Sequence, residues 1–234
     1  MSSQPTPISA TVTFDVVGSN LVIVLTNTSS GNPGYHNPDL LEGVFFSSNT
    51  PLTLSPVSAA LTAGSPLVNG SIPAGQLLGD QWQYRFSATG FSNGPLLTTD
   101  QYLIGAAGFS GMLGHGNFGS NSQNVGGLNF GIVGTDWDAA KASNGTLNQG
   151  PFEYNSVSFV LSGLPVGFSL SSILDATFVY GTAPDSLLAD DCLTCGTTSV
   201  PEPAAFSLFG IGLIGLIGIG RRRKHPLIMA NSKA

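Results

Sequence analysis

The chain has 234 residues, of which 13 are acidic and 7 are basic, and its formal net charge is −6. Charged residues make up 9% of it, well below the roughly one quarter found in ordinary soluble domains. Residues 1–203 contain all thirteen acidic residues and only two basic ones, a formal charge of −11, which excludes electrostatic binding to nucleic acid or anionic lipid.

The N-terminal residues do not look like an export signal. Residues 1–7 have neither a positively charged start nor an apolar stretch, which secretory leaders share. We therefore expect residues 1–8 to be a disordered segment and a leader to precede Met1. The rival arrangement, a C-terminal anchor with the domain in the cytoplasm, would send the basic C-terminal end outward, against the positive-inside tendency.

Residues 9–182 are predicted to form an antiparallel β-sandwich, jelly-roll or immunoglobulin-like, because short strand patterns alternate with Gly, Pro and Asn. Apolar and polar residues alternate over 11–16, a turn is expected at 18–20, and an apolar β-rich run over 21–25 completes a hairpin. Further strands are expected at 43–47, 52–54, 81–88, 128–133, 155–161 and 176–180. The best helical candidate is short, residues 136–142.

Residues 105–134 contain ten glycines. Either they form an adaptable loop that presents Phe109, His115 and Phe118, or they form a series of turns in which glycine supplies positive φ angles. The segment 114–119 matches the GxGxxG dinucleotide pattern, but no strand and helix flank it, so the match is a coincidence of glycine frequency.

Candidate catalytic and metal-binding groups are weak, and we predict no catalytic residue, metal or cofactor. The segment 108–111 resembles a nucleophile elbow with its second glycine one place early, and a Ser110–His115–Asp136 triad is the only one that suggests itself. Asp136 and Asp138 suit a calcium ion, although Asp100 or Glu153 would have to join them.

Residues 183–199, with one proline and three acidic residues, are predicted to be a linker. Cys192 and Cys195 within it are a candidate disulfide, closed locally or between two chains. Nearby acids disfavour the thiolate form, so a reactive redox pair is not expected.

The C-terminal end has three parts. Val200, Pro201, Glu202 and Pro203 form a stiff, extended tetrapeptide, because proline disfavours helical geometry in the residue before it. Residues 204–220 are uncharged and apolar, and as a transmembrane helix they would span roughly 25 Å. Arg221, Arg222, Arg223 and Lys224 then act as a topology stop, which keeps this end cytoplasmic and residues 1–203 outside.

This order of proline-containing motif, short glycine-rich apolar helix and arginine-rich stop resembles the PEP-CTERM sorting signal, over residues 200–224. The resemblance implies that exosortase, a membrane cysteine peptidase of Gram-negative bacteria that make exopolysaccharide, recognises Val200–Pro203. It also implies that the helix is discarded after cleavage. The tail 225–234 departs from the pattern, since such signals usually stop soon after the basic cluster.

The expected protein is an exosortase-sorted structural or adhesive component of an exopolysaccharide or biofilm matrix. Its precursor would sit in the inner membrane, and the mature form at the cell surface or outside the cell. It would not be an enzyme, and its partners would be the peptidase and exopolysaccharide. One alternative is a carbohydrate-binding module that stacks sugars on Trp82, Tyr84, Phe109 or Trp137; another is a secreted hydrolase that uses His36 or His115.

Overall fold

A computed structural model describes residues 8–29, 40–93, 96–138, 150–181 and 187–190, all within the unit Met1–Thr197. These residues form strands with three short 3-10 helices, so the predicted all-β class is confirmed. The strands are β1 (Ala10–Val17), β2 (Asn20–Asn27), β3 (Leu41–Ser48), β4 (Ser55–Leu61), β5 (Leu67–Val68), β6 (Gln83–Phe86), β7 (Phe91–Asn93), β8 (Leu96–Thr98), β9 (Tyr102–Gly105), β10 (Ile132–Val133), β11 (Phe152–Tyr154), β12 (Ser156–Ser162), β13 (Ile173–Tyr180) and β14 (Leu187–Asp190). The 3-10 helices are η2 (Leu78–Gln81), η3 (Phe109–Gly111) and η5 (Leu170–Ser172).

Within these described ranges no helix is long and apolar enough to cross a membrane. The predicted transmembrane segment 204–220 lies outside them.

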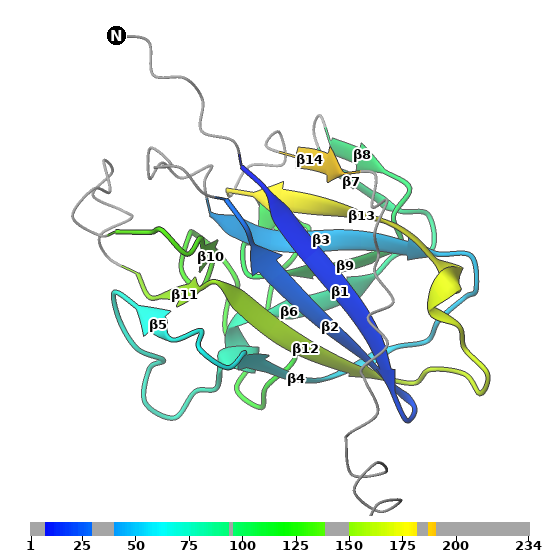
Figure 1. Cartoon of the computed structure of the whole chain (residues 1–234), viewed down its shortest axis with the longest axis horizontal. Helices are drawn as coiled ribbons and strands as arrows, with labels where there is room; N and C mark the ends of the chain where they lie inside the picture. Colours follow the sequence, from blue (N-terminus) through cyan, green and yellow to red (C-terminus); the bar gives the residue numbers. More distant parts are fainter. Residues whose placement is uncertain (1–7, 30–39, 94–95, 139–149, 182–186, 191–234) are drawn as a thin grey trace, which may run out of the picture. The chain divides into compact units, whose positions relative to one another are not determined.

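The first sheet has the order β1-β2-β12-β4 and is antiparallel throughout (Figure 1). Its β1–β2 hairpin pairs Ala10 with Asn27 and Val17 with Asn20, as the alternating pattern predicts. Gly18 closes the turn with a φ of 63°, a left-handed angle that glycine adopts without steric cost.

Both margins of this sheet lack a free, regular row of backbone donors. In β4, Pro56 has no N–H, and a shift of pairing register against β12 places an extra residue in the strand. In β1, the Asp15 carboxylate accepts a hydrogen bond from the N–H of Val16 at 2.7 Å. Proline, bulges and charged side chains are the devices that proteins use to prevent further strands from pairing at an edge.

The second sheet follows the order β14-β13-β3-β10-β11-β5, with β9 paired to β3 and β6 paired to β9. Its pairs are antiparallel except for β10 and β11, which run parallel, a departure from the fully antiparallel arrangement predicted. The strands β7 and β8 form a separate two-stranded ribbon.

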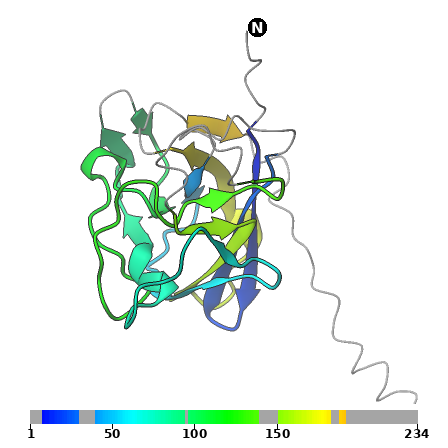
Figure 2. The same cartoon turned by 90° about the vertical axis from the view of Figure 1, so that its left-hand side faces the viewer.

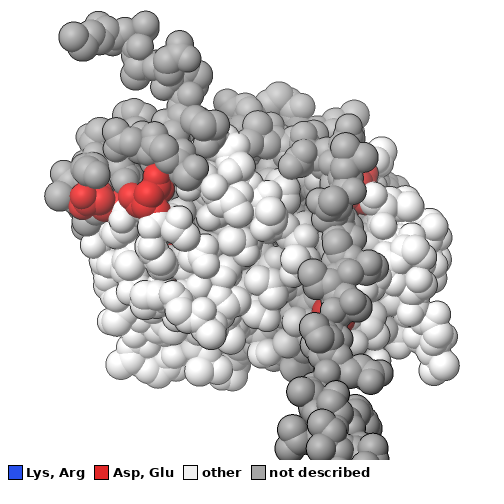
Figure 3. Space-filling model, in the orientation of Figure 1, with Lys and Arg blue, Asp and Glu red and all other residues white. Residues whose placement is uncertain are grey.

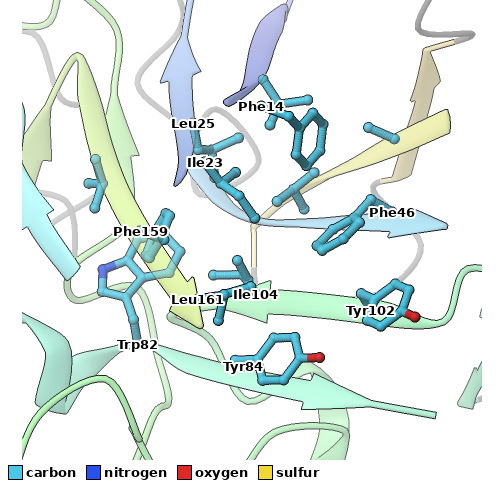
Figure 4. Packing of buried hydrophobic residues seen from close by; sticks show 14 of the residues in the cluster. Phe14, Ile23, Leu25, Phe46, Trp82, Tyr84, Tyr102, Ile104, Phe159 and Leu161 are labelled. Carbon is cyan, nitrogen blue, oxygen red and sulfur yellow. The ribbon is translucent and has the colours of Figure 1, made fainter. Parts of the chain in front are cut away.

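The core lies between the two sheets (Figure 4). The Phe14 ring of the first sheet lies 5.3 Å from the Phe46 ring of the second, and Phe159 of β12 lies 4.8 Å from Trp82 in an edge-on contact. Apolar burial of this kind contributes about 25 cal/mol per Å² and is the main force that holds two layers together. Figure 2, turned by 90°, shows the β1–β2 hairpin in blue at one side of the domain.

Several predicted elements are corrected by the structure. Residues 52–54 are not a strand; Leu52 and Leu54 are buried, and the strand begins only at Ser55. The predicted strand 128–133 shrinks to Ile132–Val133, because Phe130 has a φ of 67°, which strand geometry does not allow.

The C-terminal end of the domain and the predicted helix also differ. Strand β14 falls within the predicted linker 183–199 and extends the second sheet by one strand. Residues 136–138 are not helical, and the rest of the helical candidate 136–142 lies outside the described residues.

Candidate functional site

The glycine-rich segment packs against the domain with its backbone. A side chain at Gly116 would overlap the Asp80 carbonyl, and one at Gly119 would overlap the Asp80 carboxylate. Of the ten glycines, only Gly111 and Gly127 have positive φ, so close approach explains more of them than the predicted turn geometry does. Phe109 and Phe118 are 1% and 5% exposed, so this segment does not present them to a ligand.

Asp80 anchors this segment to η2. Its carboxylate is fully buried and accepts hydrogen bonds from the N–H of Leu77 at 2.6 Å and from the N–H of Asn121 at 2.7 Å. Backbone N–H groups compensate the lost solvation of the charge. Asp80 is therefore a structural acid, closed off from any ligand by the glycines around it.

Two further carboxyl groups are buried in the second sheet, on Glu42 of β3 and Glu153 of β11, and both residues are 0% exposed. The Trp82 indole N–H donates to one Glu153 oxygen at 2.8 Å, whereas neither Glu42 oxygen has a hydrogen-bond partner among the described residues. Gly131 leaves room for the Glu42 carboxyl, because a side chain there would overlap it.

The pKa of Glu42 is raised well above its ordinary value, first by desolvation and second by the nearby Glu153. Burial also raises the pKa of Glu153, and the Trp82 hydrogen bond lowers it by a smaller amount. An ionised carboxylate without donors is very costly in an apolar interior. Burial without donors among the described residues therefore favours the neutral form of Glu42. In the sequence, the only indication of this buried pair is that Glu42 is a single acidic residue within the otherwise apolar run 40–46.

The acids considered for calcium do not converge. Glu153 is committed to Trp82, and Asp100 lies beside Asp175 and accepts from the Thr98 hydroxyl at 2.8 Å. Asp136 and Asp138 are partly buried. Over the described ranges, no three His, Cys, Asp or Glu residues lie close enough to hold a metal ion.

The aromatic residues named for sugar stacking do not form an exposed platform. Trp82 is fully buried, Tyr84 is 7% exposed and Phe109 is 1% exposed. Trp137 is partly buried and packs at 70° against the Phe152 ring, with ring centres 6.0 Å apart. These aromatic residues pack within the domain, and the aromatic content of the sequence is equally consistent with a packing role.

The described contacts of His115 do not support the alternative that this protein is a secreted hydrolase with a catalytic histidine. This residue is exposed, its backbone N–H donates to the Gln83 side-chain oxygen at 3.1 Å, and its backbone forms a β-bridge with Asn124. Neither partner is a nucleophile or a carboxylate. His36 and the side chain of Ser110 lie outside the described residues.

A hollow of about 370 Å³ lies at the end of β6, and the sequence did not point to it. Its lining residues are Arg85, Ser87, Gly90, Phe91, Ser92, Gly111 and Met112. The Arg85 guanidinium is exposed, donates to the Met112 carbonyl, and lies 5.8 Å from the centre of the Phe91 ring. Arg85 is the only Lys or Arg in the described part of the chain.

The remaining surface seen from the side of Figure 1 is largely uncharged. Figure 3 shows a few separate acidic groups on this face, no basic ones among the coloured residues, and uncharged residues elsewhere. Such a surface is built from the Ser, Thr, Asn and Gly that replace charged residues in the sequence. Arg85 is the one basic side chain in the described part of the domain.

Comparison with known proteins identifies the C-terminal end. Residues 199–224 match the model of the PEP-CTERM protein-sorting motif, so the chain carries this motif, as its resemblance implied. The motif is that of exosortase-dependent secreted or surface proteins. No curated protein and no solved structure matches the chain. The matched segment, like Cys192 and Cys195, lies outside the residues that the structure describes.

Proposed function

We propose that this chain is a substrate of an exosortase-type membrane peptidase. The precursor is held in the inner membrane by residues 204–220, is recognised at Val200–Pro203, and loses its C-terminal helix on processing. The match of residues 199–224 to the sorting motif is the observation that carries the proposal. The physical properties of the three parts support it, since an extended tetrapeptide, an apolar helix and a basic stop suit recognition, anchoring and orientation respectively.

The mature domain acts at the cell surface or outside the cell, as a structural or adhesive component of an exopolysaccharide matrix and without catalysis. Its surface chemistry supports this role, because hydroxyl, amide and backbone groups form hydrogen bonds with the hydroxyl groups of a hydrated polysaccharide. The buried aromatic core and the enclosed Asp80 support a rigid domain rather than a reactive cleft.

Intact-mass measurement and fractionation test the processing step in the native host, with and without its peptidase gene. We expect the protein to lose a C-terminal segment that includes residues 204–220 when the peptidase is present, and to leave the inner membrane. Without the peptidase, the uncut chain remains in the inner-membrane fraction. A mature protein that keeps its tail and stays in the inner membrane would contradict the proposal.

A matched pair of variants tests the tetrapeptide. Replacing Pro201 and Pro203 together by alanine removes the restraint on Val200 and Glu202, and uncut precursor should accumulate. The control is Pro184→Ala, which removes a proline from the predicted linker and should leave processing unchanged. Equal processing of both variants would mean that the prolines do not define the recognised segment.

A further inference from the structure

Among the described residues, the Arg85 guanidinium in the hollow has no acidic partner. Within that part of the chain it makes one hydrogen bond, to the Met112 carbonyl, and no described carboxylate lies within ion-pair distance of it. A guanidinium has five N–H donors, and its planar fork suits a carboxylate or phosphate. Several donors of Arg85 are thus available at the wall of the hollow.

The hollow is shaped to hold this group in place. Phe91 is 4% exposed, so its ring forms a fixed support for the guanidinium, and a contact of this type contributes about 0.5–1 kcal/mol at an exposed site. Gly90 turns the chain with a φ of 80°, where a side chain would also overlap the Thr98 carbonyl. The Ser87 hydroxyl donates to the Gly90 carbonyl and fastens the same turn.

The lining and the size define the ligand class. Hydroxyl and backbone groups surround Arg85, and a volume of about 370 Å³ lies at the lower end of the range of small-molecule sites, roughly 300–1,000 Å³. A sugar ring matches this combination of size and polarity. Because residues 1–203 carry a formal charge of −11, a singly charged carboxylate is repelled less than a doubly charged phosphate.

We infer that the Arg85 hollow binds the carboxylate of an acidic sugar, with the guanidinium as the anion-binding group and Ser92 as a hydroxyl partner for the ring. This inference rests on the proposed function, since it names the class of polysaccharide that the matrix protein contacts. One hollow with one cation makes a weak site, so retention in a matrix comes from repeated acidic sugars along a polysaccharide.

Ligand-observed saturation-transfer NMR on the purified full-length protein tests the site. The probes are D-glucuronate, D-glucose as the neutral ring, and inorganic phosphate as the competing anion. We expect glucuronate to bind, glucose to bind much more weakly, and phosphate to compete poorly. Glucose binding as tight as that of glucuronate, or stronger competition from phosphate, would overturn the assignment.

Variants connect the binding to Arg85. Arg85→Gln should weaken glucuronate binding about 10-fold or more, since a charged hydrogen bond is lost. Lys141→Gln makes the same change of net charge at the other basic residue of segment 1–203 and should leave binding unchanged. Should Arg85→Gln fail to fold, Arg85→Lys, which keeps the charge but loses the fork, and Ser92→Ala provide the same test through intermediate losses.

The binding and processing measurements together distinguish a failure of the Arg85 site from a failure of the proposed function. Unchanged glucuronate binding by folded Arg85→Gln overturns the inference, and processed protein that is still retained in the matrix then leaves the proposed function intact. Conversely, Arg85-dependent binding by a protein that stays uncut in the inner membrane upholds the site and contradicts the function.

Discussion

Replacing Glu42 by glutamine isolates the energetic cost of its buried acid. The side chain is 0% exposed, both its oxygens lack hydrogen-bond partners in the described part of the chain, and its pKa is raised by desolvation and by Glu153. In the unfolded chain it titrates near pH 4.5, so above that pH the native state holds a proton that the unfolded state has released. The contribution to stability is therefore complete below pH 4.5 and is lost as the pH rises toward the raised folded pKa.

The size of the effect follows from the linkage relation. Each unit by which the folded pKa exceeds the unfolded one removes about 1.4 kcal/mol of stability at higher pH. Glu42→Gln keeps the shape and removes the titration, so between pH 4 and pH 8 it should gain stability relative to the native protein, by about 1.4 kcal/mol for each such unit that falls within this range. For a domain of this size that corresponds to a relative rise in melting temperature of about 3–6 °C.

Thermal unfolding followed by circular dichroism at pH 4, 6 and 8 provides the measurement. The informative quantity is how the difference in stability between Glu42→Gln and the native protein changes with pH, because any packing cost of the buried amide is the same at each pH. Asp15→Asn, at a partly exposed position whose backbone contact is local, is the control. A stability difference between Glu42→Gln and the native protein that does not change with pH across this range would refute the argument that burial raises the pKa of Glu42.

Two other substitutions test the contacts around Asp80 and Glu153. Gly116→Ala forces a side chain into the Asp80 carbonyl and should destabilise the domain by about 3 kcal/mol in a denaturant titration. The control is Gly114→Ala, which has open space around it and should cost little stability in the same titration. Equal unfolding midpoints for the two variants would contradict the close packing at Gly116. Trp82→Phe keeps an aromatic ring but removes the N–H donor to Glu153, so it should cost about 1–3 kcal/mol and raise the pKa of Glu153 further. The loss should therefore grow from pH 4 to pH 8, and a pH-independent loss would mean that the indole contributes packing alone.

The β1–β2 hairpin and β12 could be predicted from alternation because their two faces differ, whereas β3, predicted at 43–47, is buried on both faces and was indicated by its apolar and aromatic residues. The β1–β2 hairpin and β12 have one face on the core and the other toward solvent, so their side chains alternate in polarity. Strand β9 escaped prediction because all four of its residues are buried, and its glycine and aromatic residues follow no period of two. Short strands such as β5 depend on partners distant in sequence and leave no local pattern.

The site residues were less predictable for the same reason. The need for glycine at 116 and 119 arises from Asp80, which is more than thirty residues away, and no local spacing records that contact. Acidic residues are normally exposed, so nothing marked Glu42 and Glu153 as neighbours in the interior. The C-terminal sorting motif was predictable because its three parts are contiguous and each works through local chemistry.

The margins of the first sheet have a consequence for life in a crowded medium. At high local protein concentration, an exposed and regular sheet edge can template cross-β fibres. Another copy of the chain cannot form a continuous hydrogen-bond ladder along either margin of this sheet. Pro56 and the register shift interrupt pairing at β4, and the Asp15 carboxylate does so at β1. In the described part of the chain these features interrupt strand pairing at both margins of the first sheet, so under the proposed matrix role we expect neighbouring copies to meet there through side chains and not by fusion of this sheet.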